Sequence, residues 1–266
     1  MRYRIDISYV GTSFQGWQSQ ANGQGVQDYV EHALSIMLRD RIRAIGSART
    51  DSGVHAENQV AVFETNAPFD QQRWLGSLNG ILPKTIGIKS IQPAASDFHP
   101  VYAAKGKAYR YRLWLSAQRN PFVNEYCWQL GMDLDIILIK EALKFFVGRH
   151  DFSSFCAKNT SAKTRERTIF ALELECRQDR LVDIWVLGDG FLKQMVRTMV
   201  GTLVDVGRGR LTPQDITSIL EKKNRACAGE TAPPQGLCLV NVYYNEIPQI
   251  GELIALAESG FSFNIF

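Results

Sequence analysis

The chain has 266 residues, of which 45% are hydrophobic and 21% charged, and its formal net charge is +3. These values are typical of a globular protein that is long enough for one large domain or two medium ones. No apolar run reaches the roughly 18 residues of a membrane helix, and the alternating N-terminus does not resemble a signal peptide. We therefore expect a cytoplasmic protein that does not bind membranes.

The first half alternates predicted strands and helices. Residues 3–9 place every second residue, from Tyr3 to Tyr9, on one apolar face, which predicts a half-buried strand. A loop rich in Gly, Gln and Ser follows, and the apolar stripe of residues 26–39 then predicts a helix. After a polar segment at 47–56, the patterns predict three more elements: a strand at 58–64, a helix at 70–82 and a strand at 86–91.

The second half has similar content without visible sequence identity to the first. Two strands at 167–177 and 180–187 are joined by the short Gln178-Asp179 link, which suits a hairpin. The apolar pattern of residues 191–206 predicts a strong helix, and the Thr212-Pro213 pair predicts the start of a shorter one. The remaining predicted elements are a strand at 108–115, a helix at 134–147 and a last strand at 236–244.

This order of elements predicts an α+β fold of two similar lobes, each a mainly antiparallel sheet flanked by helices. We place the N-terminal lobe at residues 1–103 and the C-terminal lobe at residues 104–266. A cleft between two such lobes is a natural place for a ligand, so we expect the active site there.

Basic residues gather in three places. The first is residues 98–124, where five basic residues and several aromatic ones occur with no acid. The others are residues 158–167 and 222–225. These clusters are either solvated surface or the binding surface for a polyanion, and the sequence pattern leaves both open. The basic residues of the first cluster are Lys105, Lys107, Arg110, Arg112 and Arg119.

The cysteines and histidines do not indicate a metal site. Five cysteines are widely spread and none is spaced as C-x-x-C, so we expect reduced thiols that mostly serve packing. The four histidines lie too far apart in sequence for a local metal site.

The polar segment 47–56, SARTDSGVHA, places the carboxylate of Asp51 between Arg49 and Gly53. Three interpretations of Asp51 are possible. It caps a turn, as Asp often does; it binds a metal, although no second acid lies at a suitable spacing; or it is a nucleophile or base that Arg49 keeps ionised and oriented. Physical chemistry alone does not choose among the three.

Motifs spread over the chain carry a resemblance to a known family. The first half contains GWQ at 16–18, RTDSGVHA at 49–56 and SLN at 77–79. The second half contains KAYRYRL, HDFSSF, FLKQMVRTMVGTL and TAPPQGLCL in that order. Together they resemble the bacterial tRNA pseudouridine synthase A family over nearly the whole chain. The resemblance implies an isomerase that detaches uracil from C1′ of a uridine in tRNA, rotates it and reattaches it through C5.

The same resemblance implies roles for individual residues. It makes Asp51 the catalytic nucleophile and Tyr109 the aromatic residue that stacks on the target base, where its hydroxyl could assist removal of the C5 proton. It implies that Arg197 forms a salt bridge with the catalytic Asp, and that Arg49 contacts RNA and helps to hold the base flipped out. Family members commonly have Gly where this chain has Ala48, which would carry a cost if that position required positive φ.

The resemblance further implies the substrate and the assembly. The expected targets are uridines 38, 39 and 40 in the anticodon stem-loop of tRNA, and the expected assembly is a homodimer. Because the isomerisation involves no redox change, phosphate transfer or net hydrolysis, we expect no cofactor and no metal. The alternatives are a non-catalytic tRNA-binding protein or folding chaperone, and a metal-dependent nuclease, against which the lack of clustered acids already counts.

Overall fold

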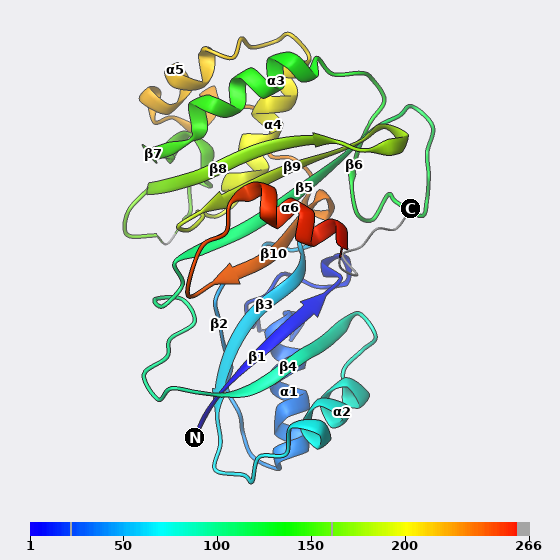
Figure 1. The fold of residues 1–266 in the computed structure, drawn as a ribbon, viewed down its shortest axis with the longest axis vertical. Helices are drawn as coiled ribbons and strands as arrows, with labels where there is room; N and C mark the ends of the chain where they lie inside the picture. Colours follow the sequence, from blue (N-terminus) through cyan, green and yellow to red (C-terminus); the bar gives the residue numbers. More distant parts are fainter. Residues whose placement is uncertain (22, 161, 260–266) are drawn as a thin grey trace. The chain divides into compact units, whose positions relative to one another are not determined.

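The computed structural model describes the whole chain except residues 22, 161 and 260–266, and its residues group into two compact units (Figure 1). Unit 1 consists of residues 1–105 and 238–245, and unit 2 of residues 106–237 and the chain from residue 246. The expected lobe boundary after residue 103 lies close to the first division, but residues 238–245 group with unit 1. None of the described helices is both long enough and apolar enough to cross a membrane.

Unit 1 has a mixed sheet in the order β4-β1-β3-β10. The central strand β1 (Arg2–Tyr9) pairs antiparallel with β3 (His55–Glu64) and with β4 (Ile86–Ala94). The last strand, β10 (Leu237–Tyr243), runs parallel to β3, with Cys238 opposite His55. The short strand β2 (Ile45–Gly46) pairs antiparallel with β3. The catalytic-loop candidate, residues 47–54, therefore connects two strands that are paired with each other.

Two α-helices complete unit 1 in the residues that the structure describes. The helix α1 (Val26–Leu38) has buried Val26, Val30 and Leu34 on its apolar stripe, and α2 (Gln71–Ile81) packs against β4 and α1. The alternation predicted for residues 3–9 is confirmed, since every second residue of β1 is buried. Tyr3 anchors the core, with its ring centroid 5.1 Å from that of Trp74.

Unit 2 has an antiparallel sheet in the order β5-β9-β8-β7. Its central strands are β5 (Gly106–Leu115), β8 (Glu166–Cys176) and β9 (Leu181–Gly188), and β9 is buried along its whole length. Two short strands extend the sheet: β7 (Gly148–Asp151) pairs with β8, and β6 (Trp128–Leu130) runs parallel to the end of β5.

The described part of unit 2 contains four α-helices. They are α3 (Ile136–Leu143), α4 (Met195–Gly207), α5 (Asp215–Lys222) and α6 (Ile250–Ser259). Nearly every residue of α4 is buried, so it forms the centre of the core. The predicted α+β class is confirmed as mixed sheet flanked by helices.

Several helix ends differ from the prediction: α3 begins at Ile136 instead of residue 134, and α5 begins at Asp215 and not at the Thr212-Pro213 pair. The helix expected from residue 191 begins at Met195, because Gln194 adopts a left-handed conformation with φ of 62°. The helix expected to reach residue 147 ends at Leu143 and continues as a 3-10 turn. The sequence patterns did not predict α6 or the strands β2, β6 and β7, which have four residues or fewer.

Candidate active site

The loop at residues 47–54 is a tightly fixed turn around Asp51. The amide of Val54 donates to the carbonyl of Asp51 at 3.1 Å, which closes the turn. Asp51 is half-buried, Thr50 is buried and Arg49 is exposed. A carboxylate on a closed turn is held at a defined place while it still reaches solvent, which suits a group that must meet a substrate.

The preceding segment 14–17 supports one side of this loop. The carbonyl of Phe14 accepts from the Ser52 hydroxyl at 3.2 Å and from the Gly53 amide at 3.3 Å, and the Trp17 amide donates to the carbonyl of Thr50 at 3.2 Å. Gly16 has φ of +82°, and a Cβ at this position would lie 2.5 Å from the carbonyl oxygen of Thr50. A side chain at residue 16 would therefore push on the residue that precedes Asp51.

Buried polar groups from β1 and β3 hold the other side of the loop. The hydroxyls of Tyr9 and Thr50 are hydrogen-bonded at 2.8 Å, and burial raises the pKa of Tyr9 well above its usual value, so this phenol stays protonated. Gln59 is fully buried; its Oε1 accepts from the Ser47 hydroxyl at 2.8 Å and its Nε2 donates to the carbonyl of Ala48 at 2.6 Å. Because these groups are buried, loss of a partner costs about 1–3 kcal/mol for each one left unsatisfied.

Residue 48, where Ala replaces the Gly common in the family, does not have the positive φ that would favour glycine. Positive φ among the described non-glycine residues is confined to Arg39, Arg180, Gln194 and Lys223. Ala48 is buried and its amide donates to Oε1 of Gln59 at 3.1 Å. Alanine at this position therefore imposes no left-handed backbone strain on the loop.

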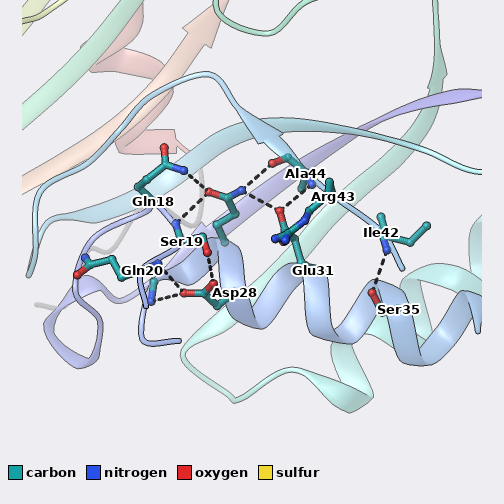
Figure 2. A network of polar contacts seen from close by, with 11 residues as sticks. Gln18, Ser19, Gln20, Asp28, Glu31, Ser35, Ile42, Arg43 and Ala44 are labelled. Atoms are coloured by element: carbon teal, nitrogen blue, oxygen red, sulfur yellow. Dashed lines mark hydrogen bonds and ion pairs between the residues drawn. The ribbon is translucent and has the colours of Figure 1, made fainter. Parts of the chain in front are cut away.

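The first turns of α1 fix the two segments that flank the loop in space (Figure 2). Gln27 accepts from the side chain of Gln18 at 2.9 Å and donates to the carbonyl of Ala44 at 3.0 Å. Glu31, only 6% exposed, accepts from the Ala44 amide at 3.0 Å and pairs with Arg43 at 2.7 Å. One helix thus positions both the support segment and the chain that leads into residues 47–54.

Asp28 completes this network. Its carboxylate accepts from the amide of Gly25 at 2.9 Å, the hydroxyl of Ser19 at 2.5 Å and the amide of Gln20 at 3.3 Å. A carboxylate in the first turn of a helix is also favoured by the helix dipole. The sequence patterns did not identify Gln27, Asp28, Glu31 or Gln59 as supports of the site, because their partners lie in other segments.

Two other predicted site residues, Tyr109 and Arg197, belong to unit 2. Tyr109 lies on β5, is 7% exposed and meets Phe191 edge to face with ring centroids 5.0 Å apart. Arg197 lies on α4 and is half-buried; its Nε donates to the carbonyl of Ala232 at 2.7 Å. Burial raises the pKa of Tyr111, and the positive charge of Arg197 opposes that rise. The sequence motif FLKQMVR therefore places a partly buried cation beside the tyrosine strand.

The first basic cluster divides into buried and accessible residues. Arg112 makes two hydrogen bonds with the buried carboxylate of Asp183, at 2.8 and 2.9 Å, and Arg110 lies over the ring of Trp185 at 5.4 Å. Both arginines are less than 8% exposed, so they serve the core of unit 2 and not a polyanion surface. Lys105 is exposed and Lys107 is half-buried.

Among the residues that the structure describes, no three His, Cys, Asp or Glu side chains lie close enough together to hold a metal ion.

Comparison with known proteins identifies relatives across most of the chain. The family described as tRNA pseudouridine synthase matches residues 7–103 and 142–245. The chain is 43% identical over 241 residues to tRNA pseudouridine synthase A of Acetivibrio thermocellus, covering 91% of this chain and 98% of the relative. It is 40% identical over 247 residues to the Bacillus subtilis protein of the same name, covering 92% and 100%. Among solved structures, an archaeal box H/ACA Nop10–Cbf5 complex is a distant match, with a TM-score of 0.36 and 12% identity over 84% of this chain and 59% of the other.

Proposed function

The chain belongs to the tRNA pseudouridine synthase family, and from this membership we propose that Asp51 is the nucleophile with which it isomerises uridines 38, 39 and 40 in the anticodon stem-loop of tRNA. The enzyme is an isomerase with tRNA pseudouridine synthase activity. The observation that carries the proposal is the fixed turn of residues 47–54, which presents a half-buried carboxylate between an exposed arginine and a supporting segment.

The reaction breaks the bond between N1 and C1′ of uridine and forms a bond between C5 and C1′; the hydrogen of C5 leaves as a proton, and N1 takes up a proton. Attack by Asp51 on C6 or on C1′ would start this exchange, as would removal of a ribose proton. An ionised carboxylate suits each of these steps as a nucleophile or base. Every atom of the nucleoside except that exchanged proton is retained.

Three further residues complete the proposed site. Tyr109 would stack on the uracil, for about 1–3 kcal/mol, and its hydroxyl would assist loss of the C5 proton. Arg197 would pair with Asp51, and Arg49 would contact the RNA backbone and help to offset the few kcal/mol that extrusion of a base costs. The proposal thus draws Asp51 and Arg49 from unit 1 and Tyr109 and Arg197 from unit 2. It also includes a cytosolic homodimer as the working assembly.

The experiment that tests this proposal measures tritium release from tRNA that carries [5-³H]uridine at position 38, 39 or 40. We expect release by the native protein, with and without EDTA, and no measurable turnover by Asp51→Asn, which keeps tRNA binding within a few-fold. Asp133→Asn is the matched control, because the side chain of Asp133 is 87% exposed and makes only a long contact of 3.9 Å with Arg180. Release by Asp51→Asn at the native rate would refute the assignment, and bound tRNA without release by the native protein would indicate a binding protein.

A further inference from the structure

The connection at residues 95–105 joins β4 to β5 (Figure 1). It contains Tyr102, an aromatic residue that the proposed reaction does not use. Tyr102 is 85% exposed, the most exposed of the large hydrophobic residues described. Its ring lies on that of His99, with centroids 4.3 Å apart and planes inclined by 32°. One face of the tyrosine is therefore covered by histidine, and the ring stands in solvent.

The turn that carries this pair is held by its own backbone. Nδ1 of His99 accepts from the amide of Val101 at 3.2 Å and from that of Tyr102 at 3.4 Å, and the carbonyl of His99 accepts from the amide of Ala103 at 2.9 Å. Since Nδ1 is an acceptor, the proton of the neutral imidazole is on Nε2. The histidine ring is thus fixed in orientation and supports the tyrosine ring.

The turn is also fixed to the rest of unit 1. The hydroxyl of Tyr244 donates to the carbonyl of Pro100 at 3.0 Å, and Nη1 of Arg2 donates to the carbonyl of Phe98 at 3.0 Å. The ring of Phe98 meets that of Tyr244 at a centroid distance of 4.9 Å. At the far end, the amide of Lys105 donates to the carbonyl of Tyr243 at 2.8 Å. An exposed ring on so rigid a support loses little further conformational entropy when it binds a partner.

The charge around the turn favours an anionic partner. Lys105 is exposed three residues beyond Tyr102, and no acid occurs from Phe98 to Asn124. The nearest acid in sequence is the exposed Asp97, on the other side of the histidine. A flat exposed ring with a cation close by in sequence is the combination by which proteins hold unpaired nucleotides, with the base on the ring and the phosphate near the cation.

We propose that Tyr102, supported by His99, is a stacking site for a second unpaired base of the tRNA, other than the uridine that reacts, and that Lys105 binds a phosphate beside it. This inference rests on the proposed tRNA substrate. The site would bind the unpaired loop and set its register, and it would take no part in bond making or breaking. It therefore predicts an effect on binding and on KM, with little effect on turnover at saturating tRNA.

The test compares native protein with four variants of the turn and one control variant in tRNA binding at several salt concentrations. Tyr102→Ala and Tyr102→Leu should raise Kd by about 5- to 100-fold, because both remove the aromatic face, whereas Tyr102→Phe should stay within about twofold of native. The salt dependence of Kd should be unchanged in Tyr102→Ala but reduced by about one unit of slope in Lys105→Ala, because only the lysine meets a phosphate. Ile137→Ala, at a residue 79% exposed on α3, controls for the loss of an exposed apolar side chain.

A second measurement identifies the base. 2-Aminopurine placed at each unpaired position of the anticodon loop in turn should be quenched by native protein at one position, and that quenching should be lost with Tyr102→Ala. The inference is overturned if Tyr102→Ala binds tRNA like native protein or if Tyr102→Phe loses as much affinity as Tyr102→Ala. It is also overturned if 2-aminopurine is quenched equally by native protein and by Tyr102→Ala at every position. Tritium release by native protein, measured alongside, separates this failure from failure of the proposed function.

Discussion

Gly16 offers a sharp test of how the loop around Asp51 is positioned. In Gly16→Ala the new methyl group would lie 2.5 Å from the carbonyl oxygen of Thr50, whereas ordinary contacts begin at 3.4 Å. The loop or the support segment must therefore move by about 0.9 Å. Because a misplacement of about 1 Å can cost roughly 100-fold in rate, we expect turnover to fall on the order of 100-fold.

The matched control is Gly209→Ala. Gly209 has φ of +70°, similar to the +82° of Gly16, but a Cβ there meets no atom within 4 Å. Both variants carry the cost of a left-handed alanine, about 1–2 kcal/mol in the free energy of unfolding, and only Gly16→Ala carries the collision. Tritium release at saturating tRNA and urea unfolding of both variants separate the two effects. Native turnover in Gly16→Ala, with unfolding equal to that of Gly209→Ala, would refute the positioning argument.

Three further predictions concern charged groups. Asp183→Ala leaves Arg112 and Arg177 without their buried carboxylate, so we expect urea unfolding to show that the free energy of unfolding falls by about 3–5 kcal/mol. Burial raises the pKa of Asp183, but the hydrogen bonds and charge of Arg112 outweigh burial and lower the pKa overall. The stabilisation by Asp183 is therefore present above the usual pKa of Asp, near pH 4, and is lost as the pH falls below it. Lys105→Ala combined with Lys107→Ala should weaken tRNA binding and reduce the slope of log K against log salt concentration by about two units. An unchanged slope would show that neither lysine contacts the tRNA. Burial and the charge of Arg167 lower the pKa of Lys107 to about 8, so its contribution to binding should decline as the pH rises through 8, and Lys107→Ala should lose that part of the pH dependence.

The elements that were predicted correctly are those with strong local periodicity. The alternation of β1 and the apolar stripe of α1 both report burial along a single segment, so sequence alone identifies them. The start of α4 was predicted four residues too early because nothing local marks Gln194 as left-handed. The short strands β2, β6 and β7 depend on pairing with distant strands, and so short a segment has too few residues for a periodic pattern.

The candidate site shows the same division. The motif around Asp51 identifies the loop, but the groups that hold it, such as Gln59 and Gly16, act through contacts with other segments. Arg112 fits neither interpretation left open for its cluster, solvated surface or polyanion surface, because it pairs with Asp183, 71 residues away in sequence, and both residues are buried. A local sequence pattern does not identify a charged partner that lies far away along the chain.

The place of β10 in unit 1 has a consequence for synthesis of the protein. Residues 238–245 complete a unit whose other residues end at 105, and Cys238 and Leu239 pair with His55 and Ala56, which directly follow the loop of Asp51. Because a ribosome makes the chain from its N-terminus, β3 emerges with the edge beside these residues unpaired until about 170 further residues have been added. A chain that is truncated or stalled before residue 237 therefore lacks the strand that lies beside the start of β3, next to the loop of Asp51, so that border of the loop forms only late in synthesis.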